Sequence, residues 1–195
     1  MEYANDYSGY GNHILYCMCK ERPFHKDIDT IEAKLWLIGR AYSAAIERKA
    51  GKDFNLHHAA EKIKSSDIDS YISNLKKIDR ISYENVEVLL TAHKYLTDIL
   101  KSITGLEKRS LASKYLHFHA PQSVFIYDSR ATHRIKEIVR LPKKFKLTKK
   151  FDNDYEGFVY RCIYYRDEIF EQEISAFASP RKIDMKLLGY GNIPL

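Results

Sequence analysis

The sequence is poor in the features that mark secreted and membrane proteins. It has three cysteines, Cys17, Cys19 and Cys162, an odd number without a framework spacing, which argues against a disulfide scaffold and indicates a reducing compartment. No apolar run approaches the roughly 18 residues of a membrane span. The first residues, Met1–Asp6, are acidic and polar, unlike a secretory signal. We therefore expect a cytoplasmic protein that does not bind a membrane.

Signatures of common catalytic sites are also missing. There is no glycine-rich phosphate-binding loop and no serine or cysteine in a nucleophile elbow. Cys17 and Cys19 are one residue too close for the usual zinc or redox pair, and no second pair follows. His117 and His119 would point to different sides of a helix, which makes them poor joint ligands. We expect neither a metal ion nor an organic cofactor.

What is present indicates a folded helical protein. Hydrophobic residues make up 45% of the 195 residues and aromatic residues 13%, which excludes disorder as the main state. Alternating strand patterns are nearly absent, whereas apolar residues recur at helical spacing along most of the chain. The sequence predicts an all-α fold with helices at about 30–50, 57–64, 67–77, 83–104, 107–118, 129–140, 153–177 and 181–188.

We expect one compact domain over residues 1–195, because the chain shows no repeat and no low-complexity linker. Within it, two helical lobes with a cleft between them are compatible with the pattern, one over 25–100 with the termini and one over 101–150. Val124–Tyr127 is an apolar run too short for a helix, and we expect it to be extended.

Positive charge is concentrated in one stretch. Residues 130–150 hold nine basic residues and a single acid, Glu137, a net charge of +8, which leaves −2 for the rest of a chain whose net charge is +6. A solvated surface accounts for such a run. A phosphate-binding surface accounts for it equally well, because lysine and arginine supply most non-specific affinity for nucleic acids.

The order of elements from Ile103 to Arg140 is specific: helix, glycine turn at Gly105, helix, the extended run, aspartate, helix. In sequence it includes Phe-Ile-Tyr-Asp-Ser-Arg over residues 125–130. This segment resembles the helix-hairpin-helix DNA glycosylase superfamily. The resemblance implies a prokaryotic enzyme acting on double-stranded DNA, in base excision repair or in defence against modified phage DNA.

Asp128 takes the catalytic role in that resemblance. Cleavage of an N-glycosidic bond builds positive charge on the sugar, and a carboxylate stabilises this charge or activates a water molecule. A helix N-terminus favours the ionised carboxylate by roughly 0.3–1 kcal/mol. The plain alternative is an N-cap aspartate, and the two roles are compatible.

The hairpin and the helix after Asp128 would contact the DNA backbone. Thr104 and Glu107 depart from the family's pattern, in which a proline and a second glycine stand, and an acid at 107 would repel a phosphate. The DNA-binding residues implied by the resemblance are Gly105, Arg109, Ser110, Lys114, Arg130, Arg134, Lys143, Lys144 and Lys146.

Family members that also cut the strand use a Schiff-base lysine in the second helix of the hairpin. Ser110 lies 18 residues before Asp128, Lys108 lies 20 before it and Lys114 lies 14 before it. Lys108 is the lyase candidate by this register. Serine at 110 resembles the enzymes that use water alone, so we expect a monofunctional glycosylase.

A base pocket is less defined by the sequence. Trp36, Arg40, Tyr42 and Tyr127 are candidates to stack on or bind a flipped base. The identity of the base stays open between damaged and hypermodified bases.

The sequence is also compatible with functions of other classes. One is a non-enzymatic nucleic-acid-binding protein that uses residues 130–150, with Asp128 only a helix cap. Another is a protein-interaction module that docks through its tyrosine-rich N-terminus. A small ribonuclease is disfavoured, because neither Arg109 with His117 nor Arg130 with His133 has the expected spacing.

Overall fold

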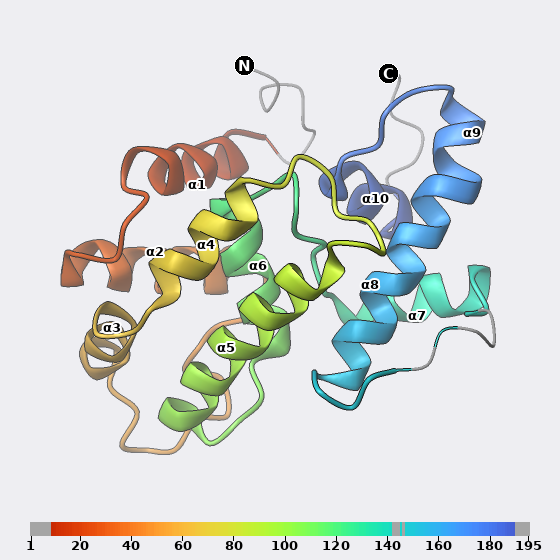
Figure 1. The fold of residues 1–195 in the computed structure, drawn as a ribbon. Coiled ribbons are helices and arrows are strands. Elements are labelled where there is room, and N and C mark those ends of the chain that lie inside the picture. The colour runs from red at the N-terminus through yellow and green to blue at the C-terminus, as the bar shows by residue number, and fades with distance from the viewer. Residues whose placement is uncertain (1–8, 142–144, 146, 190–195) are drawn as a thin grey trace.

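The computed structural model describes residues 9–141, 145 and 147–189, and in this part of the chain it is helical without a strand, which confirms the all-α prediction. The elements are α1 Gly9–Glu21, α2 Ile28–Ala41, α3 Leu56–Lys64, α4 Ile68–Lys76, α5 Val86–Thr104, α6 Arg109–His119, α7 Ser129–Ile138, α8 Asn153–Tyr165, a π-helical turn Arg166–Phe170, α9 Glu171–Ile174 and α10 Pro180–Leu187 (Figure 1).

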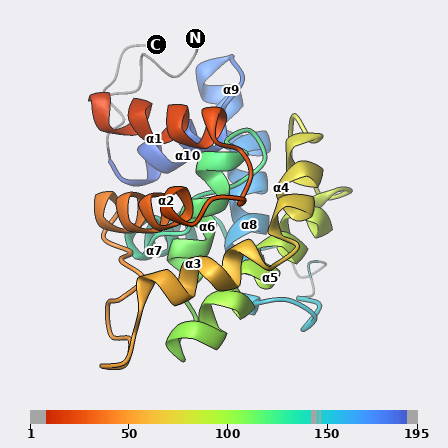
Figure 2. The ribbon, with the colours of Figure 1, turned by 90° about the vertical axis from the view of Figure 1, so that its left-hand side faces the viewer.

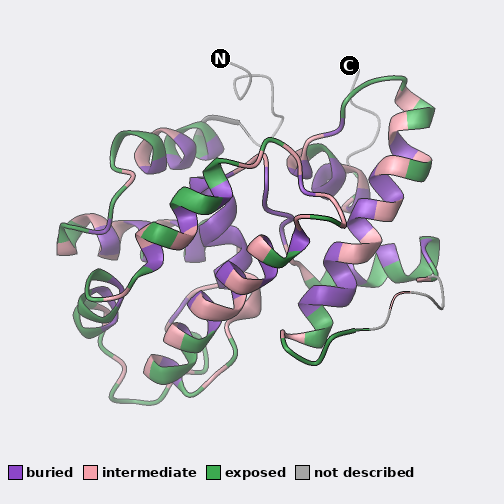
Figure 3. Ribbon diagram, in the orientation of Figure 1, coloured by how far each residue is buried: buried purple, intermediate pink, exposed green. Residues whose placement is uncertain are grey.

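Helix α6 is the centre of the fold. It packs against α1, α2, α4 and α5, and all of its residues from Leu111 to His119 are buried (Figures 2 and 3). Helices α7, α8 and α10 form a second group, in which α7 contacts both α8 and α10. One contiguous apolar core runs through both groups, from Leu15 in α1 to Leu187 in α10. The residues of α6 are therefore buried mainly by the helices of the first group.

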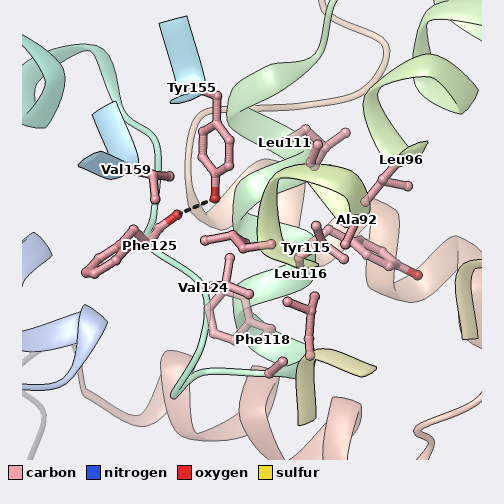
Figure 4. Packing of buried hydrophobic residues seen from close by; sticks show 14 of the residues in the cluster. Ala92, Leu96, Leu111, Tyr115, Leu116, Phe118, Val124, Phe125, Tyr155 and Val159 are labelled. Carbon is pink, nitrogen blue, oxygen red and sulfur yellow. Dashed lines mark hydrogen bonds between the residues drawn. The ribbon is translucent and has the colours of Figure 1, made fainter. Parts of the chain in front are cut away.

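The run Val124–Tyr127 is extended, as expected, and it passes through the core beside α6 (Figure 4). Since it has no strand partner, side chains satisfy its backbone groups. The Tyr155 hydroxyl donates to the carbonyl oxygen of Phe125 at 3.1 Å, and the amide of Tyr127 donates to Ser113 Oγ at 2.9 Å. These contacts fix the position of the residue that follows, Asp128.

The helix predicted over 30–50 is too long. The structure ends α2 at Ala41, and the chain then turns back on itself. Ser43 has a positive φ of 52°, and the amide of Ala44 donates to the carbonyl of Gly39 at 2.8 Å. The returning backbone passes so close that a Cβ on Gly39 would lie 3.1 Å from it. A glycine inside an otherwise regular helical pattern thus marks a close approach rather than a continuing helix.

The helix predicted over 153–177 is also interrupted. It divides into α8, the π-helical turn and α9, which ends at Ile174. Arg166, at the junction, is buried and donates through Nη2 to the carbonyl of Ile81 at 2.6 Å. This buried arginine, which also pairs with Asp167 at 2.7 Å, lies at the point where the helix changes from α to π winding.

Helix α1 is absent from the sequence prediction. Glycines and tyrosines in this segment obscure its helical apolar pattern. The structure buries three residues of one helix face: Leu15, Tyr16 and Cys19. The Tyr16 hydroxyl bonds Nε2 of His117 at 2.7 Å and so fixes α1 to α6.

A buried polar network links α2, α4 and the segment before α2 to α6. Nδ1 of His25 lies 2.6 Å from Asp69 in α4, and its Nε2 lies 2.8 Å from the Tyr115 hydroxyl. Nζ of Lys34 in α2 lies 3.0 Å from Nε2 of His119. Burial lowers the pKa of Lys34 and lowers the pKa of His119 well below its ordinary value. These contacts cross-link the chain and leave Lys34 without solvent exposure.

Candidate functional site

Asp128 is the N-cap of α7. Its Oδ1 accepts a hydrogen bond from the amide of Arg130 at 2.9 Å, which satisfies one of the free donors of the first helical turn. The buried extended run precedes it, yet 29% of its side chain remains exposed. The carboxylate is therefore fixed by the backbone and open to a ligand on one side.

Lys114 of α6 approaches this carboxylate from the interior. Its Nζ lies 3.5 Å from Oδ2 of Asp128, and it donates to Ser110 Oγ at 2.8 Å and to the carbonyl oxygen of Tyr42 at 3.2 Å. Only 2% of its side chain is exposed. Three acceptors face the three donors of the ammonium group, so the buried charge is fully paired.

Asp184 of α10 is the third ionisable group in this place. It is 3% exposed, and its Oδ2 accepts from Nη1 of Arg181 at 2.6 Å. Its Oδ1 has no hydrogen-bond partner among the described residues. Burial raises the pKa of Asp184 to about 6; the cations of Arg181 and Lys114 oppose this shift, and the carboxylate of Asp128 adds to it.

Burial acts on Lys114 in the opposite sense. Removal from water disfavours the ammonium form and lowers the pKa of Lys114, while the carboxylates of Asp128 and Asp184 partly restore it. A lysine of this kind releases its proton at lower pH than a surface lysine, and desolvated amines of this type act as nucleophiles towards carbonyl and sugar carbons. The site thus combines a potential nucleophile with a carboxylate able to stabilise a cation.

The structure brings Lys114, and not Lys108, to the carboxylate. Lys108 caps α6, and its Nζ donates to the carbonyl oxygen of Arg48. Ser110, which the sequence register aligns with the Schiff-base position, contacts the amine of Lys114 instead. In this conformation Lys114 is buried, so its amine does not lie at the surface where the expected phosphate contact would form.

The turn between α5 and α6 is the place of the expected hairpin. Gly105 ends α5 with a φ of 70°, a left-handed conformation that glycine adopts without strain. Glu107 pairs with Lys101 at 3.0 Å and with Arg109 at 3.0 Å. The acid that departs from the family's pattern therefore neutralises the cations on either side of the turn.

Arg109 is held by a set of carboxylates. Its Nε donates to Oδ2 of Asp152 at 2.7 Å, and its Nη1 lies 3.5 Å from Asp154. The guanidinium carbon also lies 5.9 Å from the centre of the Tyr127 ring. This arginine joins α6 to the start of α8, a structural role that leaves little of its charge for DNA.

The basic stretch is partly neutralised as well. Arg134 pairs with Glu137 at 3.1 Å, and Lys150 pairs with Glu87. Arg130 is exposed, and its guanidinium donates to the carbonyl oxygen of Leu188 at 3.3 Å. This contact involves no carboxylate and therefore does not neutralise the charge of Arg130. Three residues assigned to DNA binding lie outside the described residues: Lys143, Lys144 and Lys146.

The four base-pocket candidates separate into two places. Trp36 is 49% exposed on α2, with Arg40 beside its ring at 5.9 Å. Tyr42 adjoins Lys114 through its carbonyl and its ring, whose centre lies 5.8 Å from the amine. Tyr127 packs its ring on the core next to Asp128. Tyr42 and Tyr127 therefore adjoin the candidate site, and no contact joins Trp36 or Arg40 to it among the described residues.

Two surface hollows lie away from this site. One of about 450 Å³ opens between α4 and α5 and is lined by residues that include Tyr71 and Asn74. A smaller one of about 110 Å³ lies by His119 and Ser123. Neither is lined by Asp128 or Lys114, so these two hollows do not open onto the pair.

Sequence reasoning missed Asp184, and it misplaced Lys114 at the surface. One signal for Lys114 was present: it stands with Leu111, Tyr115 and Phe118 at the i, i+3, i+4 and i+7 positions of an apolar helix face. A lysine on such a face is buried and needs a counter-charge. The sequence holds no comparable signal that α10 reaches this place.

Within residues 9–141, 145 and 147–189, no three side chains of histidine, cysteine, aspartate or glutamate gather as a potential metal site. No helix in the same ranges has the length and apolar character needed to cross a membrane.

Comparison with known protein families, with curated proteins and with solved structures finds no match to the chain. Evidence on function therefore comes from the chain itself, namely the geometry of Lys114 and Asp128 and the order of elements from Ile103 to Arg140.

Proposed function

We propose that the protein is a DNA glycosylase-like enzyme that cleaves the N-glycosidic bond of a flipped, damaged or modified base in double-stranded DNA. Asp128 stabilises the positive charge that develops on the sugar, and Lys114 is the attacking amine. One observation carries the proposal: Nζ of Lys114 lies 3.5 Å from Oδ2 of Asp128 in a buried site with one exposed side.

The role of Asp128 follows from the charge that forms during the reaction. As the base leaves, the sugar acquires oxocarbenium character, and a fixed carboxylate lowers the energy of that cation. The N-cap bond to Arg130 holds the carboxylate in place before the substrate arrives. Oδ2, the oxygen not used in the cap, faces Lys114, and the sugar would approach the exposed part of the Asp128 side chain.

The role of Lys114 follows from its burial. The neutral amine attacks C1′ while the C1′–N bond breaks; the base leaves with the electron pair and takes up a proton. Opening of the sugar ring then gives an imine between Lys114 and C1′, from which strand cleavage by elimination follows. Burial lowers the pKa of Lys114 and so increases the fraction of neutral amine.

This assignment differs from the monofunctional mechanism expected from the sequence register. That register aligned Ser110 with the lysine position, but the structure places the amine of Lys114 on Ser110 Oγ, at 2.8 Å, and beside the carboxylate. Since Lys114 is only 2% exposed, attack requires its amine to leave Ser110 and the carbonyl of Tyr42 and to move towards the exposed side of Asp128.

DNA would be bound along the start of α7. Arg130 and Arg134 are exposed and follow Asp128 within two turns of helix, so their charges flank the position of the flipped nucleotide. Cations at such positions bind phosphates and make affinity dependent on salt.

The test is incubation of the protein with duplexes that each hold one modified base, scored for abasic sites and for strand breaks. Breaks that form without alkali support the amine mechanism, and breaks that appear only after alkali indicate attack by water. Salt-dependent binding without release of any base would instead support the non-enzymatic DNA-binding protein.

A further inference from the structure

The pair of Lys114 and Asp128 has a neighbour on α10 that the proposed chemistry does not use. Asp184 is 3% exposed and lies on a helix that packs against α7. One carboxylate oxygen accepts from Arg181, and the other is buried without a hydrogen-bond partner among the described residues. A buried carboxylate with a free oxygen is costly, so a nearby cation is expected to offset the cost.

We infer that Asp184 is a positioning residue for Lys114: together with Asp128 it encloses the lysine between two carboxylates, with the ammonium as their shared counter-ion. The consequence for catalysis rests on the proposed function, whereas the enclosure itself is a property of the protein without DNA.

The charges around the amine support this enclosure from three helices. α6 supplies Lys114, the N-cap of α7 supplies Asp128, and α10 supplies Asp184 with Arg181. Two cations thus face two anions, and the cluster is neutral when all four are ionised. The thiol of Cys162 on α8 also faces Asp184, but burial raises its pKa well above the ordinary value and keeps it uncharged.

The ring of Tyr42 lies near both cations of the cluster. The centre of its ring lies 5.8 Å from Nζ of Lys114 and 5.8 Å from the guanidinium carbon of Arg181. Its carbonyl oxygen accepts from Lys114 at 3.2 Å. The Tyr42 ring thus lies close both to Lys114 on α6 and to Arg181 on α10, the arginine that pairs with Asp184.

The charges of these groups determine whether each substitution raises or lowers the pKa of its neighbours. Each carboxylate stabilises the ammonium form of Lys114, so removal of the Asp184 charge lowers the pKa of the lysine. By reciprocity, removal of the Lys114 charge raises the pKa of Asp184. Removal of the Asp128 charge has the opposite effect on Asp184, because like charges repel.

These signs are measurable by NMR on the DNA-free protein labelled with ¹³C at the aspartate carboxyl carbons. One resonance should titrate with a midpoint near pH 6 and disappear in Asp184→Asn. Its midpoint should rise by about 1 pH unit in Lys114→Met and fall in Asp128→Asn. Lys108→Met, a charge removal on the same helix, should leave it unchanged.

The inference is overturned if Lys114→Met leaves the midpoint in place, or if Lys114→Met and Asp128→Asn shift it in the same direction. Lys114→Gln replaces Lys114→Met if the methionine variant does not fold, as judged by its amide spectrum. Simple packing of Asp184 against α6 predicts no such pair of opposite shifts.

A second measurement separates this inference from the proposed function. Borohydride trapping of the imine, with a modified duplex, is followed against pH in wild type and Asp184→Asn. The rising limb of the profile should move to lower pH in the variant, because its Lys114 gives up a proton more readily. No adduct in wild type, with the NMR shifts as expected, refutes the proposed function alone; an unchanged profile refutes the role of Asp184 in the reaction.

Discussion

Nζ of Lys114 and Oδ2 of Asp128 lie 3.5 Å apart although the residues are 14 positions apart in sequence. In a continuous helix that separation would place them about 21 Å apart. The chain instead leaves α6 after His119, turns near Pro121 and returns in extended form along the same helix. The pairing therefore depends on the extended run through the core, and it explains why a buried lysine is tolerated at the centre of the fold.

Replacement of Asp128 by asparagine should abolish base release and preserve DNA binding. Asparagine is as good an N-cap as aspartate, so the bond to the amide of Arg130 is kept and α7 is expected to form normally. Loss of the charge removes stabilisation of the sugar cation, and we expect a fall in the single-turnover rate of base release of about 100-fold or more.

Asp27→Asn is the matched control for that variant. Asp27 caps α2 in the same manner, accepting from the amide of Thr30 at 2.9 Å, and it lies at the surface. It should retain the wild-type rate. An Asp128→Asn protein with wild-type activity, or two variants with equal losses, would remove Asp128 from the catalytic role.

Arg109→Gln should reduce stability without changing the salt dependence of DNA binding. The guanidinium bonds Asp152, whose side chain is only 12% exposed, and loss of this ion pair leaves a carboxylate largely buried. We expect a decrease of about 1–3 kcal/mol in the free energy of unfolding, measured in urea.

Arg130→Gln should behave in the opposite way. Arg130 is exposed, and its guanidinium donates to the carbonyl oxygen of Leu188. Removal of the guanidinium should therefore barely change the free energy of unfolding. The slope of log affinity against log salt should decrease by about 1. If Arg109→Gln changes that slope and Arg130→Gln does not, the DNA-binding surface lies at the hairpin rather than on α7.

The free energy of unfolding should decrease as the pH falls from about 7 towards 4, in part because of His93. Burial lowers the pKa of this histidine to about 4, below the 6.5 of an exposed histidine. The unfolded chain then binds a proton that the folded chain does not, so stability present above pH 6.5 is lost as the pH falls. This contributes roughly 2 kcal/mol between pH 7.5 and 5.

His93→Phe tests that contribution. The imidazole stacks on Tyr155 with ring centres 3.5 Å apart, a contact that phenylalanine retains, while the hydrogen bond to the carbonyl of Arg109 is lost. The variant should be less stable at pH 7.5 but should lose less stability on acidification than wild type does. Parallel pH curves for the two proteins would contradict the pKa of His93.

Local patterns in the sequence predicted most of the helices. The Asp128 cap and the extended run before it follow from residue type and spacing alone, and so does the end of α5 at Gly105, where a left-handed glycine stops the helix. The early end of α2 does not follow from residue type and spacing, because it depends on the close return of the chain past Gly39. Helix periodicity carries no information on such a tertiary contact.

In the candidate site, too, local sequence patterns predicted some features, whereas others depend on tertiary contacts. Asp128 was found from its position after an apolar run and before a helix. Lys114 was placed on the surface, because its burial results from the packing of α6 against neighbouring helices such as α1 and α2, and Asp184 joins the site only through the position of α10. The register taken from the resemblance favoured Ser110 or Lys108, whereas the fold places Lys114 beside Asp128.

Covalent trapping is the most direct test of whether Lys114 is the attacking amine. The protein is incubated with modified duplexes and borohydride, the adduct is digested, and mass spectrometry locates the reduced nucleotide. We expect an adduct on Lys114 in wild type and in Lys108→Met, and none in Lys114→Met. An adduct on Lys108, or base release at the wild-type rate by Lys114→Met, would contradict it.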